Sequence, residues 1–374
     1  MARVLEYICM EFFLETKDLS VGYGRNPLIK NINISVRKGE ILTVIGPNGA
    51  GKSTILKSIS KQLKKMSGEV FVEEEEIEKI KEFNLAKKLA FVSTNKINQD
   101  MMSCEEVVCL GRYPHTGRFG HLSAKDKEKA EMALKLVDAI DIRYNDYMKV
   151  SDGQKQKVRI AMAICQEPDI IILDEPTSFL DIRHKIEVLE ILKNMARNGT
   201  SVIMSLHELE LVRLISDKVL CVDEKSIVRY AGCEEVFQGD FIDELYHVKS
   251  GSFHSEISTV FMKKNTESPK VFVVAGNGTG ISVFYKLSKK GIAFAAGILQ
   301  ENDIDAYFAK QMTEYVVSCP PFESASQRET EQALKILSQC KKVIVTVKTF
   351  GTANKENENI VHEAERLGIE VEYV

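Results

Sequence analysis

The chain has 374 residues, more than one typical domain, so two or three domains are expected. Hydrophobic residues make up 44% and charged residues 28%, as in an ordinary globular protein, and a formal net charge of -4 gives no general case for nucleic-acid binding. The 8 cysteines form no CxxC pair and no metal-like spacing with histidine, which favours buried, reduced thiols. No apolar run reaches the length of about 18 residues that spans a membrane. The opening MARVLEYICMEFF is too weak for a signal peptide, and both Met1 and Met10 are candidate starts.

Residues 12–46 alternate polar and apolar side chains in short runs, which predicts an antiparallel sheet leading into a buried strand, Ile41 to Ile45. The stretch GPNGAGKST then fits G-x-x-x-x-G-K-[ST] in full, between this strand and a helix. Backbone N–H groups in such a loop surround phosphates, Lys52 supplies positive charge, and the Ser53 hydroxyl is a ligand for Mg²⁺. The predicted nucleotide-binding residues are Gly46, Pro47, Asn48, Gly49, Ala50, Gly51, Lys52, Ser53 and Thr54.

A strand–helix alternation from Asp169 to about residue 223 predicts a parallel α/β sheet, after a mostly helical stretch from about 103 to 163. Within it, the apolar run IIILDEP delivers Asp174 to the carboxyl edge of the sheet, where it can hold Mg²⁺ directly or through water. Glu175 follows at once and is placed to take a proton from attacking water. This pair, together with the glycine loop, predicts nucleotide hydrolysis.

Residues 12–262 resemble the ATP-binding subunits of ABC transporters, through GPNGAGKST, VSDGQKQKVRIAMAICQEPDIIILDEPTSFLD and MSLHELE. The resemblance implies a P-loop ATPase with antiparallel β and helical subdomains, the helical one at about 97–163, using ATP and Mg²⁺. It also implies roles for single residues. Tyr23 matches the aromatic that stacks on adenine, and His207 the switch histidine that contacts the γ-phosphate. Ser151, Gly153 and Gln154 match the signature that caps ATP on the opposite subunit, and Asp181 matches the loop that crosses the dimer interface.

Two positions depart from the family pattern. Asp152 stands where the signature usually has a second glycine, and we expect it to point outward and cap the signature helix. Thr94 stands where the family has a glutamine that reaches the metal and the attacking water. Threonine is shorter but still offers an oxygen, so metal coordination through Thr94 is in doubt.

The segments from Val107 to Asp138 and from Glu234 to Val248 resemble importers of iron–siderophore complexes, haem and cobalamin. This resemblance implies a homodimer or paired ATPase subunits at the cytoplasmic face of the membrane, docked on a separate permease through residues 94–120, with a substrate-binding protein acting indirectly. Arg112, Tyr113 and His115 are candidates for the docking surface. An iron–siderophore is the first choice of cargo, with cobalamin and haem as alternatives.

A soluble ABC ATPase acting on nucleic acid or ribosomes is the alternative from a different class. Such proteins commonly carry two cassettes or a long coiled-coil insertion, and this chain has neither. No nucleic acid is therefore expected as a partner.

A polar stretch at 263–270 is the expected linker, and 271–374 alternates five strands with four helices, which predicts a small doubly wound, Rossmann-like domain. Its first strand runs into a second glycine loop with Gly276, Gly278 and Gly280. No lysine follows, and Ile281 occupies the place of the third glycine in the dinucleotide fingerprint. Glu301, just past the second strand, is an acid that could bind a ribose.

The second loop leaves two interpretations open: a site for a nucleotide or small metabolite, or a tight turn. No catalytic triad, Cys–His pair or metal cluster accompanies it, which favours a sensing or regulatory module over an enzyme fused to the ATPase.

Overall fold

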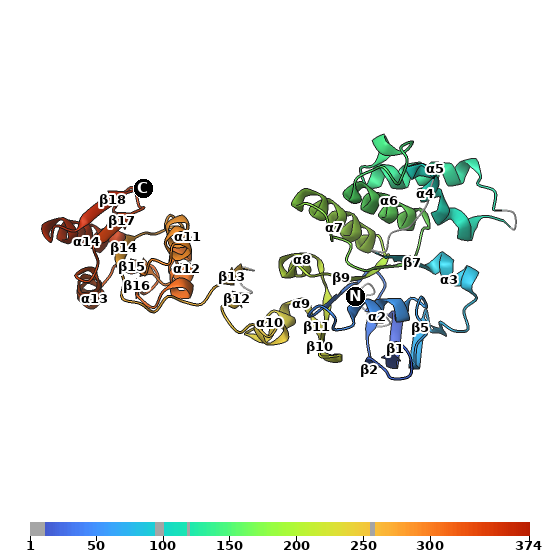
Figure 1. Cartoon of the computed structure of the whole chain (residues 1–374), viewed down its shortest axis with the longest axis horizontal. Coiled ribbons are helices and arrows are strands. Elements are labelled where there is room, and N and C mark those ends of the chain that lie inside the picture. The colour runs from blue at the N-terminus through green and yellow to red at the C-terminus, as the bar shows by residue number, and fades with distance from the viewer. Residues whose placement is uncertain (1–11, 94–100, 118–119, 255–258) are drawn as a thin grey trace, which may run out of the picture. The chain divides into compact units, whose positions relative to one another are not determined.

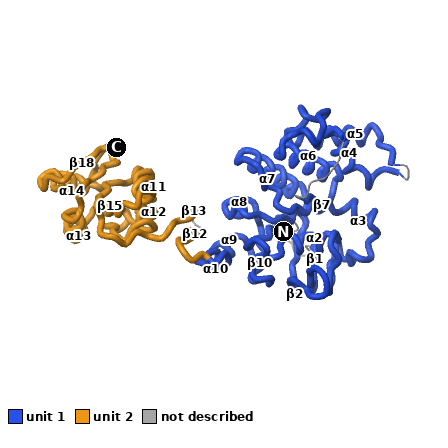
Figure 2. Tube along the Cα trace, viewed as in Figure 1, with its two compact units in different colours: residues 1–247 blue, residues 248–374 orange. Residues whose placement is uncertain are grey.

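The structure is a computed structural model that describes residues 12–93, 101–117, 120–254 and 259–374. The chain divides into two compact units, Met1–His247 and Val248–Val374, coloured separately in Figure 2. Each has its own sheets and its own core, so each is considered by itself. Among the described residues, no helix is both long enough and apolar enough to cross a membrane.

The first unit is built around a six-stranded sheet in the order β11-β10-β4-β9-β8-β7. Strands β7, β9, β10 and β11 are labelled in Figure 1. All neighbours pair in parallel except β10 and β11. Every residue of β4, β8 and β9 is buried, as expected for central parallel strands covered on both faces. The strands are β4 (Ile41–Ile45), β7 (Leu89–Val92), β8 (Ile170–Leu173), β9 (Ser201–Ser205), β10 (Lys218–Asp223) and β11 (Ser226–Gly232).

A second, antiparallel sheet of the first unit shares a hydrophobic core with β4 and α2, the helix Lys52–Ile59. Its long strand β1 contributes Phe13, Leu14, Leu19 and Val21 to this core. The expected sheet leading into Ile41–Ile45 is confirmed. Its strands are β1 (Phe12–Val21), β2 (Ile29–Ile32), β3 (Ser35–Arg37), β5 (Ser67–Val72) and β6 (Glu75–Glu76).

The expected helical subdomain is present between β7 and β8 as far as the described residues show. Its helices α4 (Cys104–Cys109), α5 (Ala124–Leu136) and α6 (Asp152–Cys165) pack against one another. Each begins at a serine that closes a capping box, which satisfies free N–H groups of the first turn. The other helices of the unit are α3 (Glu82–Lys88), η2 (Leu110–His115), η3 (Ile140–Ile142), α7 (Ile182–Arg197), α8 (Leu209–Ile215), α9 (Cys233–Val236) and α10 (Phe241–Leu245).

The second unit contains a five-stranded, fully parallel sheet in the order β16-β15-β14-β17-β18. This confirms the expected doubly wound domain with five strands and four α-helices. The strands are β14 (Val271–Val274), β15 (Phe294–Gln300), β16 (Val316–Cys319), β17 (Lys342–Val345) and β18 (Glu370–Tyr373). The helices are α11 (Ile281–Lys289), α12 (Ile304–Met312), α13 (Gln327–Leu337), η4 (Thr352–Asn354) and α14 (Lys355–Arg366).

The second unit begins earlier than the linker expected at 263–270. A hairpin of β12 (Ser252–His254) and β13 (Thr259–Phe261) belongs to it. Phe261 is 2% exposed and lies in the same hydrophobic cluster as Phe284 and Phe294, and His254 hydrogen-bonds the hydroxyl of Tyr307 at 2.9 Å. The boundary differs because this aromatic packing is made between residues distant in the sequence, which local composition does not reveal.

Candidate functional site

The first glycine loop joins β4 to α2 along a path that depends on glycine. Gly46, Gly49 and Gly51 have φ values of 141°, 81° and 108°, a region that residues with side chains rarely adopt. A Cβ atom on Gly46 would also lie 1.9 Å from the carbonyl oxygen of Val222 on β10. The strand therefore delivers a tight loop directly onto the start of a helix, whose free N–H groups and dipole favour an anion.

Lys52, the first residue of α2, turns back over this loop. Its side chain is 6% exposed, and Nζ donates hydrogen bonds to the carbonyl oxygens of Gly46 at 2.7 Å and Pro47 at 3.0 Å. Burial lowers the pKa of Lys52, and the nearby carboxylates of Glu175 and Asp174 act in the opposite direction. A buried ammonium group is thus held in the loop next to two acids.

Asp174 follows β8 and lies beside the loop, as predicted. It is 5% exposed, and its Oδ1 accepts hydrogen bonds from Ser53 Oγ at 2.9 Å and from Ser205 Oγ at 2.8 Å. Hydroxyl and carboxylate oxygens are the ligands that Mg²⁺ prefers, usually together with substrate phosphates. Among the described residues, no group of three or more His, Cys, Asp or Glu side chains could hold a metal by itself. The donor set of Ser53 and Asp174 therefore fits a Mg²⁺ ion that is shared with a phosphorylated substrate.

Glu175 stands next to Asp174 with a φ of 50°, which is unusual for a residue with a side chain. Its Oε1 lies 2.6 Å from His207 Nε2, and its Oε2 accepts a hydrogen bond from Ser178 Oγ at 2.9 Å. Burial raises the pKa of Glu175, but the hydrogen bonds from His207 and Ser178 outweigh it, so the net pKa is lowered. The predicted base is thus an ionised carboxylate, engaged by the predicted switch histidine.

This cluster agrees with comparisons to known proteins. The ABC transporter family matches residues 29–178. An uncharacterized ABC transporter ATP-binding protein of Methanocaldococcus jannaschii is 38% identical over 288 residues, covering 76% of this chain and 99% of the relative. The chain belongs to the ABC transporter ATP-binding proteins. It is an ABC ATPase, and its cassette binds ATP.

Two further matches and a second family complete the comparison. The iron(3+)-hydroxamate import ATP-binding protein FhuC of Bacillus subtilis is 31% identical over 236 residues, covering 63% of this chain and 88% of the relative. A solved ABC transporter assigned to the metal-chelate type, in an inward-facing conformation, matches with a TM-score of 0.56 and 26% identity, covering 63% of this chain and 90% of that chain. The MJ0874 family matches residues 294–374 of the second unit.

The signature residues of the ABC ATPase lie at the start of α6. Ser151 is the N-cap: its Oγ accepts a hydrogen bond from Gln154 N at 3.2 Å, and Gln154 Oε1 accepts one from Ser151 N at 3.0 Å. Asp152 was expected to point outward and to cap this helix; it does point outward, but the capping part is wrong, because Ser151 is the N-cap. The Asp152 side chain is 72% exposed, 3.9 Å from Lys155. The hydrogen bonds of Ser151 and Gln154 stay within this helix start.

Two other predicted ATP-contacting residues are exposed in the single chain. Asp181 is the N-cap of α7, and its Oδ1 accepts hydrogen bonds from the backbone N–H of His184 at 3.0 Å. Tyr23 lies in the turn after β1 and is 61% exposed. Thr94, the doubtful metal ligand, lies outside the described residues.

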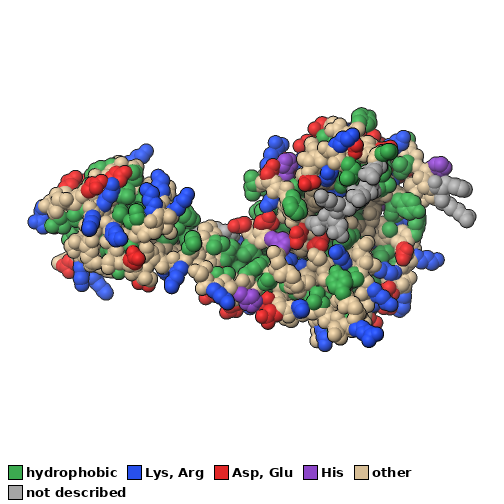
Figure 3. Space-filling view, viewed as in Figure 1, with side chains coloured by type: hydrophobic (Ala, Val, Ile, Leu, Met, Phe, Trp, Pro, Cys, Tyr) green, Lys and Arg blue, Asp and Glu red, His purple; other side chains and the backbone are tan. Residues whose placement is uncertain are grey.

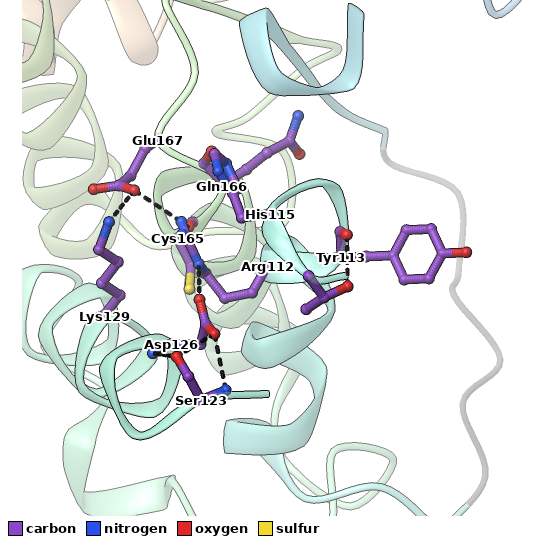
Figure 4. A network of polar contacts seen from close by, with 10 residues as sticks. Arg112, Tyr113, His115, Ser123, Asp126, Lys129, Cys165, Gln166 and Glu167 are labelled. Carbon is purple, nitrogen blue, oxygen red and sulfur yellow. Dashed lines mark hydrogen bonds and ion pairs between the residues drawn. The ribbon is translucent and has the colours of Figure 1, made fainter. Parts of the chain in front are cut away.

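Arg112, a candidate docking residue, is a buried structural residue instead (Figure 4). It is 3% exposed, and its guanidinium donates to Asp126 Oδ1 at 3.0 Å, to Cys165 O at 2.6 Å and to Glu167 Oε2 at 2.9 Å. Hydrogen bonds from Ser123 and then from Arg112 lower the pKa of Asp126 to about 2. The docking prediction is wrong for Arg112, since its guanidinium is engaged in hydrogen bonds that link η2 to α5 and to the end of α6.

The neighbours of Arg112 remain accessible. Tyr113 is 70% exposed and points away from the network in Figure 4, while His115 hydrogen-bonds the carbonyl oxygen of Gln166 at 2.8 Å. Tyr113 lines a groove of about 570 Å³ in the helical subdomain, with Leu110 and Tyr144. The remaining lining residues are Met102, Ser103, Glu105, Glu106, Cys109, Thr116, Gly120, Leu122 and Lys127.

The second glycine loop has three glycines in three different situations. Gly278 has a φ of 77°, and a Cβ on Gly280 would lie 2.6 Å from the Cβ of Ala275, so Gly280 permits close packing of α11 on β14. Neither a positive φ nor crowding explains a glycine at 276. Its φ is not positive, and a Cβ there would make only ordinary contacts, at 3.5 Å and beyond. Glu301 donates its N–H to Cys319 O and is not among the residues that line the adjacent crevice.

Two residues that position the ATPase cluster are not apparent from the sequence. Ser205 ends β9 and bonds both Asp174 Oδ1 and the backbone N–H of Glu175, the latter at 2.9 Å. A polar residue at the carboxyl end of a strand with an apolar centre was the available signal. Tyr246, which follows α10, accepts a hydrogen bond from Gly46 N at 3.2 Å, and nothing local to its sequence indicates this contact.

Proposed function

We propose that this ABC ATPase hydrolyses ATP to drive the import of an iron–siderophore complex through a separate permease. ABC ATPases act in pairs with such a permease. The observation that carries the proposal is the joint placement of Lys52, Ser53, Asp174, Glu175 and His207 at one edge of the core sheet. The relative that imports iron(3+)-hydroxamate supports the choice of cargo.

Binding of ATP uses the first loop. The backbone N–H groups from Gly49 to Lys52 donate to the phosphates, and Lys52 Nζ exchanges its carbonyl partners for β- and γ-phosphate oxygens. Ser53 and Asp174 are the side chains that would hold Mg²⁺, which would neutralise charge on these oxygens. Tyr23 stacks on the adenine, and Thr94 remains a further candidate ligand.

Hydrolysis uses Glu175 as the general base. Its ionised carboxylate accepts a proton from the water that attacks the γ-phosphorus, and the bond to the β–γ bridging oxygen breaks. His207 holds Glu175 in this structure, so it must release the carboxylate before water can bind there. A histidine that then contacts the γ-phosphate would join nucleotide binding to activation of the base.

Completion of the site depends on a second copy. Ser151, Gln154 and Asp181 hydrogen-bond within their own helix starts, and the start of α6 offers hydroxyl and N–H groups to an anion. Gly153 lies in this same start. In the proposed homodimer, these residues cap the ATP bound by the opposite subunit. Closure follows from the tighter binding of ATP by the paired state.

Contact with the permease is proposed at the groove that Tyr113 lines. It is partly apolar, and a permease helix presenting apolar side chains fits such a groove. This places the ATPase at the cytoplasmic face of the membrane. A substrate-binding protein would act on the permease and not on this chain.

Action on nucleic acid is not favoured. On the face shown in Figure 3, basic and acidic side chains are intermingled on both units. Proteins that bind nucleic acid usually present a broad basic surface.

Substitution of the base tests the hydrolysis step. Glu175→Gln keeps the shape of the side chain but cannot accept the proton, so ATP turnover should fall roughly 100- to 10,000-fold. ATP binding should persist, and the variant should accumulate as an ATP-bound dimer in size-exclusion chromatography. The matched control is Glu210→Gln, an exposed glutamate three residues after His207, which should leave turnover unchanged. Normal turnover in Glu175→Gln would remove Glu175 from the mechanism.

The cargo is tested in cells lacking the gene. Uptake of a radiolabelled ferric hydroxamate should fall, and the wild-type gene but not the Glu175→Gln gene should restore it. Unchanged ferric uptake with lost uptake of labelled cobalamin or haem would replace the cargo and keep the ATPase mechanism.

A further inference from the structure

The second unit has a crevice at the carboxyl end of its parallel sheet. The chain runs from β14 to β15 and β16 on one side, then returns to β17 and β18 on the other, so the strand order reverses between β14 and β17. Ligands of doubly wound sheets bind at such a reversal. The crevice has a volume of about 390 Å³, within the range of small-molecule sites. Its walls come from the loop after β14, the end of β15, the segment after β17 and the start of α14.

Two N–H groups of the glycine loop beside the crevice donate hydrogen bonds to carboxylates of the same unit. Asn277 N donates to Asp303 Oδ2 at 2.7 Å, and Gly280 N donates to both carboxylate oxygens of Asp305 at 3.1 Å. Asp305 is 0% exposed. These two acids occupy two of the donors that a phosphate would need, and the Asp303 carboxylate, which lines the crevice, would repel its charge. A phosphate group on this loop is therefore disfavoured.

A buried side chain at the crevice wall has an unused acceptor. Asn357 of α14 is 1% exposed, and its Nδ2 donates to Ile298 O at 2.9 Å. Its Oδ1 is shielded from solvent and accepts no hydrogen bond from the part of the chain that the structure describes. A buried acceptor without a donor costs about 1–3 kcal/mol. A ligand carrying an N–H or O–H group would relieve this cost.

Gly276 lies where a ligand would enter this site. It lines the crevice, yet neither its φ nor crowding around its Cβ position requires a glycine. Absence of a side chain there leaves the crevice open between Asp303 and Val347, the two residues nearest that position. Close approach of a ligand to the backbone is the remaining reason for a glycine.

We propose that this crevice binds a neutral, unphosphorylated small molecule of nucleoside size, with an N–H or O–H group directed at Asn357 Oδ1. The ligand enters past Gly276, and the Asp303 carboxylate at the crevice wall excludes its phosphorylated forms. The site is separate from the ATPase cluster, so the proposal stands or falls independently of the transport function.

Hydrogen–deuterium exchange of the full-length chain tests the proposal. Adenosine, guanosine, cytidine and uridine are each added at millimolar concentration, with the first loop saturated by a non-hydrolysable ATP analogue. At least one nucleoside should slow exchange in peptides covering 275–280, 298–303 and 347–357. Its 5′-monophosphate should bind at least roughly tenfold more weakly, because like charges would be brought together. Absence of protection by all four nucleosides, or equal binding of the monophosphate, would overturn the proposal.

Variants separate the ligand site from a structural role. Gly276→Ala should abolish the protection by nucleoside. In the absence of ligand, exchange of the second unit should be unchanged, since the methyl group has room there. Asn357→Leu should also abolish the protection, because leucine lacks the acceptor that the ligand is proposed to bond. Glu301→Gln, outside the crevice, is the control and should bind normally. Normal nucleoside binding by Gly276→Ala would contradict the proposed entry path and overturn the assignment.

Discussion

The glycine loops at 46–53 and 276–280 both leave the carboxyl end of a buried parallel strand and enter a helix. In the first loop the charged side chain is Lys52, and the nearby acids Asp174 and Glu175 bond hydroxyl and imidazole groups instead of the loop's N–H groups. In the second loop no lysine follows, and Asp303 and Asp305 take up the loop's own N–H groups.

This contrast shows that strand–glycine–helix geometry does not by itself make a phosphate site. In the first loop, Lys52 places a cation beside the N–H groups, and the nearby acids bond side chains instead. The second supplies its own anions. The charge that the protein places against the loop decides what the loop can bind.

Among changes to the two loops and their supports, removal of the cation should have the largest effect. Lys52→Met should lower ATP hydrolysis by roughly 100- to 1,000-fold, because a preorganised positive group at the phosphates is lost. Steady-state phosphate release measures this. Lys348→Met, at the crevice of the second unit, is the matched control and should not change turnover. An equal loss in both variants would mean that the two loops are not functionally distinct.

Crowding of the second loop should affect folding and not hydrolysis. Gly280→Ala places a methyl group within 2.6 Å of Ala275 Cβ, so the second unit should lose about 1–3 kcal/mol of unfolding free energy. Urea unfolding read by limited proteolysis with peptide mass analysis measures this unit separately. Gly276→Ala should stay within about 0.5 kcal/mol of wild type. Equal stability of the two alanine variants would show that Gly280 has no packing role.

A smaller effect is expected from the support behind the first loop. Tyr246→Phe removes the hydroxyl that accepts the Gly46 N–H, and the loss of one hydrogen bond, about 1 kcal/mol, should weaken ATP binding several-fold. Isothermal titration with an ATP analogue measures the change. Tyr230→Phe, which removes a hydroxyl bonded to Ser35 O instead, should leave ATP affinity unchanged.

Much of the ATPase cassette was predictable because its signals are local. GPNGAGKST and IIILDEP specify a strand, a turn and the chemical groups in a few consecutive residues, and the structure brings Ser53 and Asp174 into contact as expected. The five strands and four helices of the second unit followed from simple alternation.

The remaining features depend on contacts between distant residues. A basic–aromatic stretch around Arg112 looked like a docking surface, but Asp126 and Glu167 withdraw the guanidinium into the helical subdomain. Asp152 and Ser151 are both good N-caps by type, and only the helix start decides between them. Likewise, the hairpin at 252–261 joins the second unit through aromatic packing that its own sequence does not indicate.

Tyr246 has a consequence for how the two units are joined. Burial raises its pKa to about 12, so the hydroxyl keeps its proton, and its oxygen steadies Gly46. The first unit ends at His247, one residue later. The covalent tether to the second unit is therefore anchored directly behind the phosphate loop. A cassette truncated before Tyr246 loses a support of its ATP site as well as the second unit. To measure the effect of removing the second unit alone on the ATPase rate, a shortened protein should therefore end after His247.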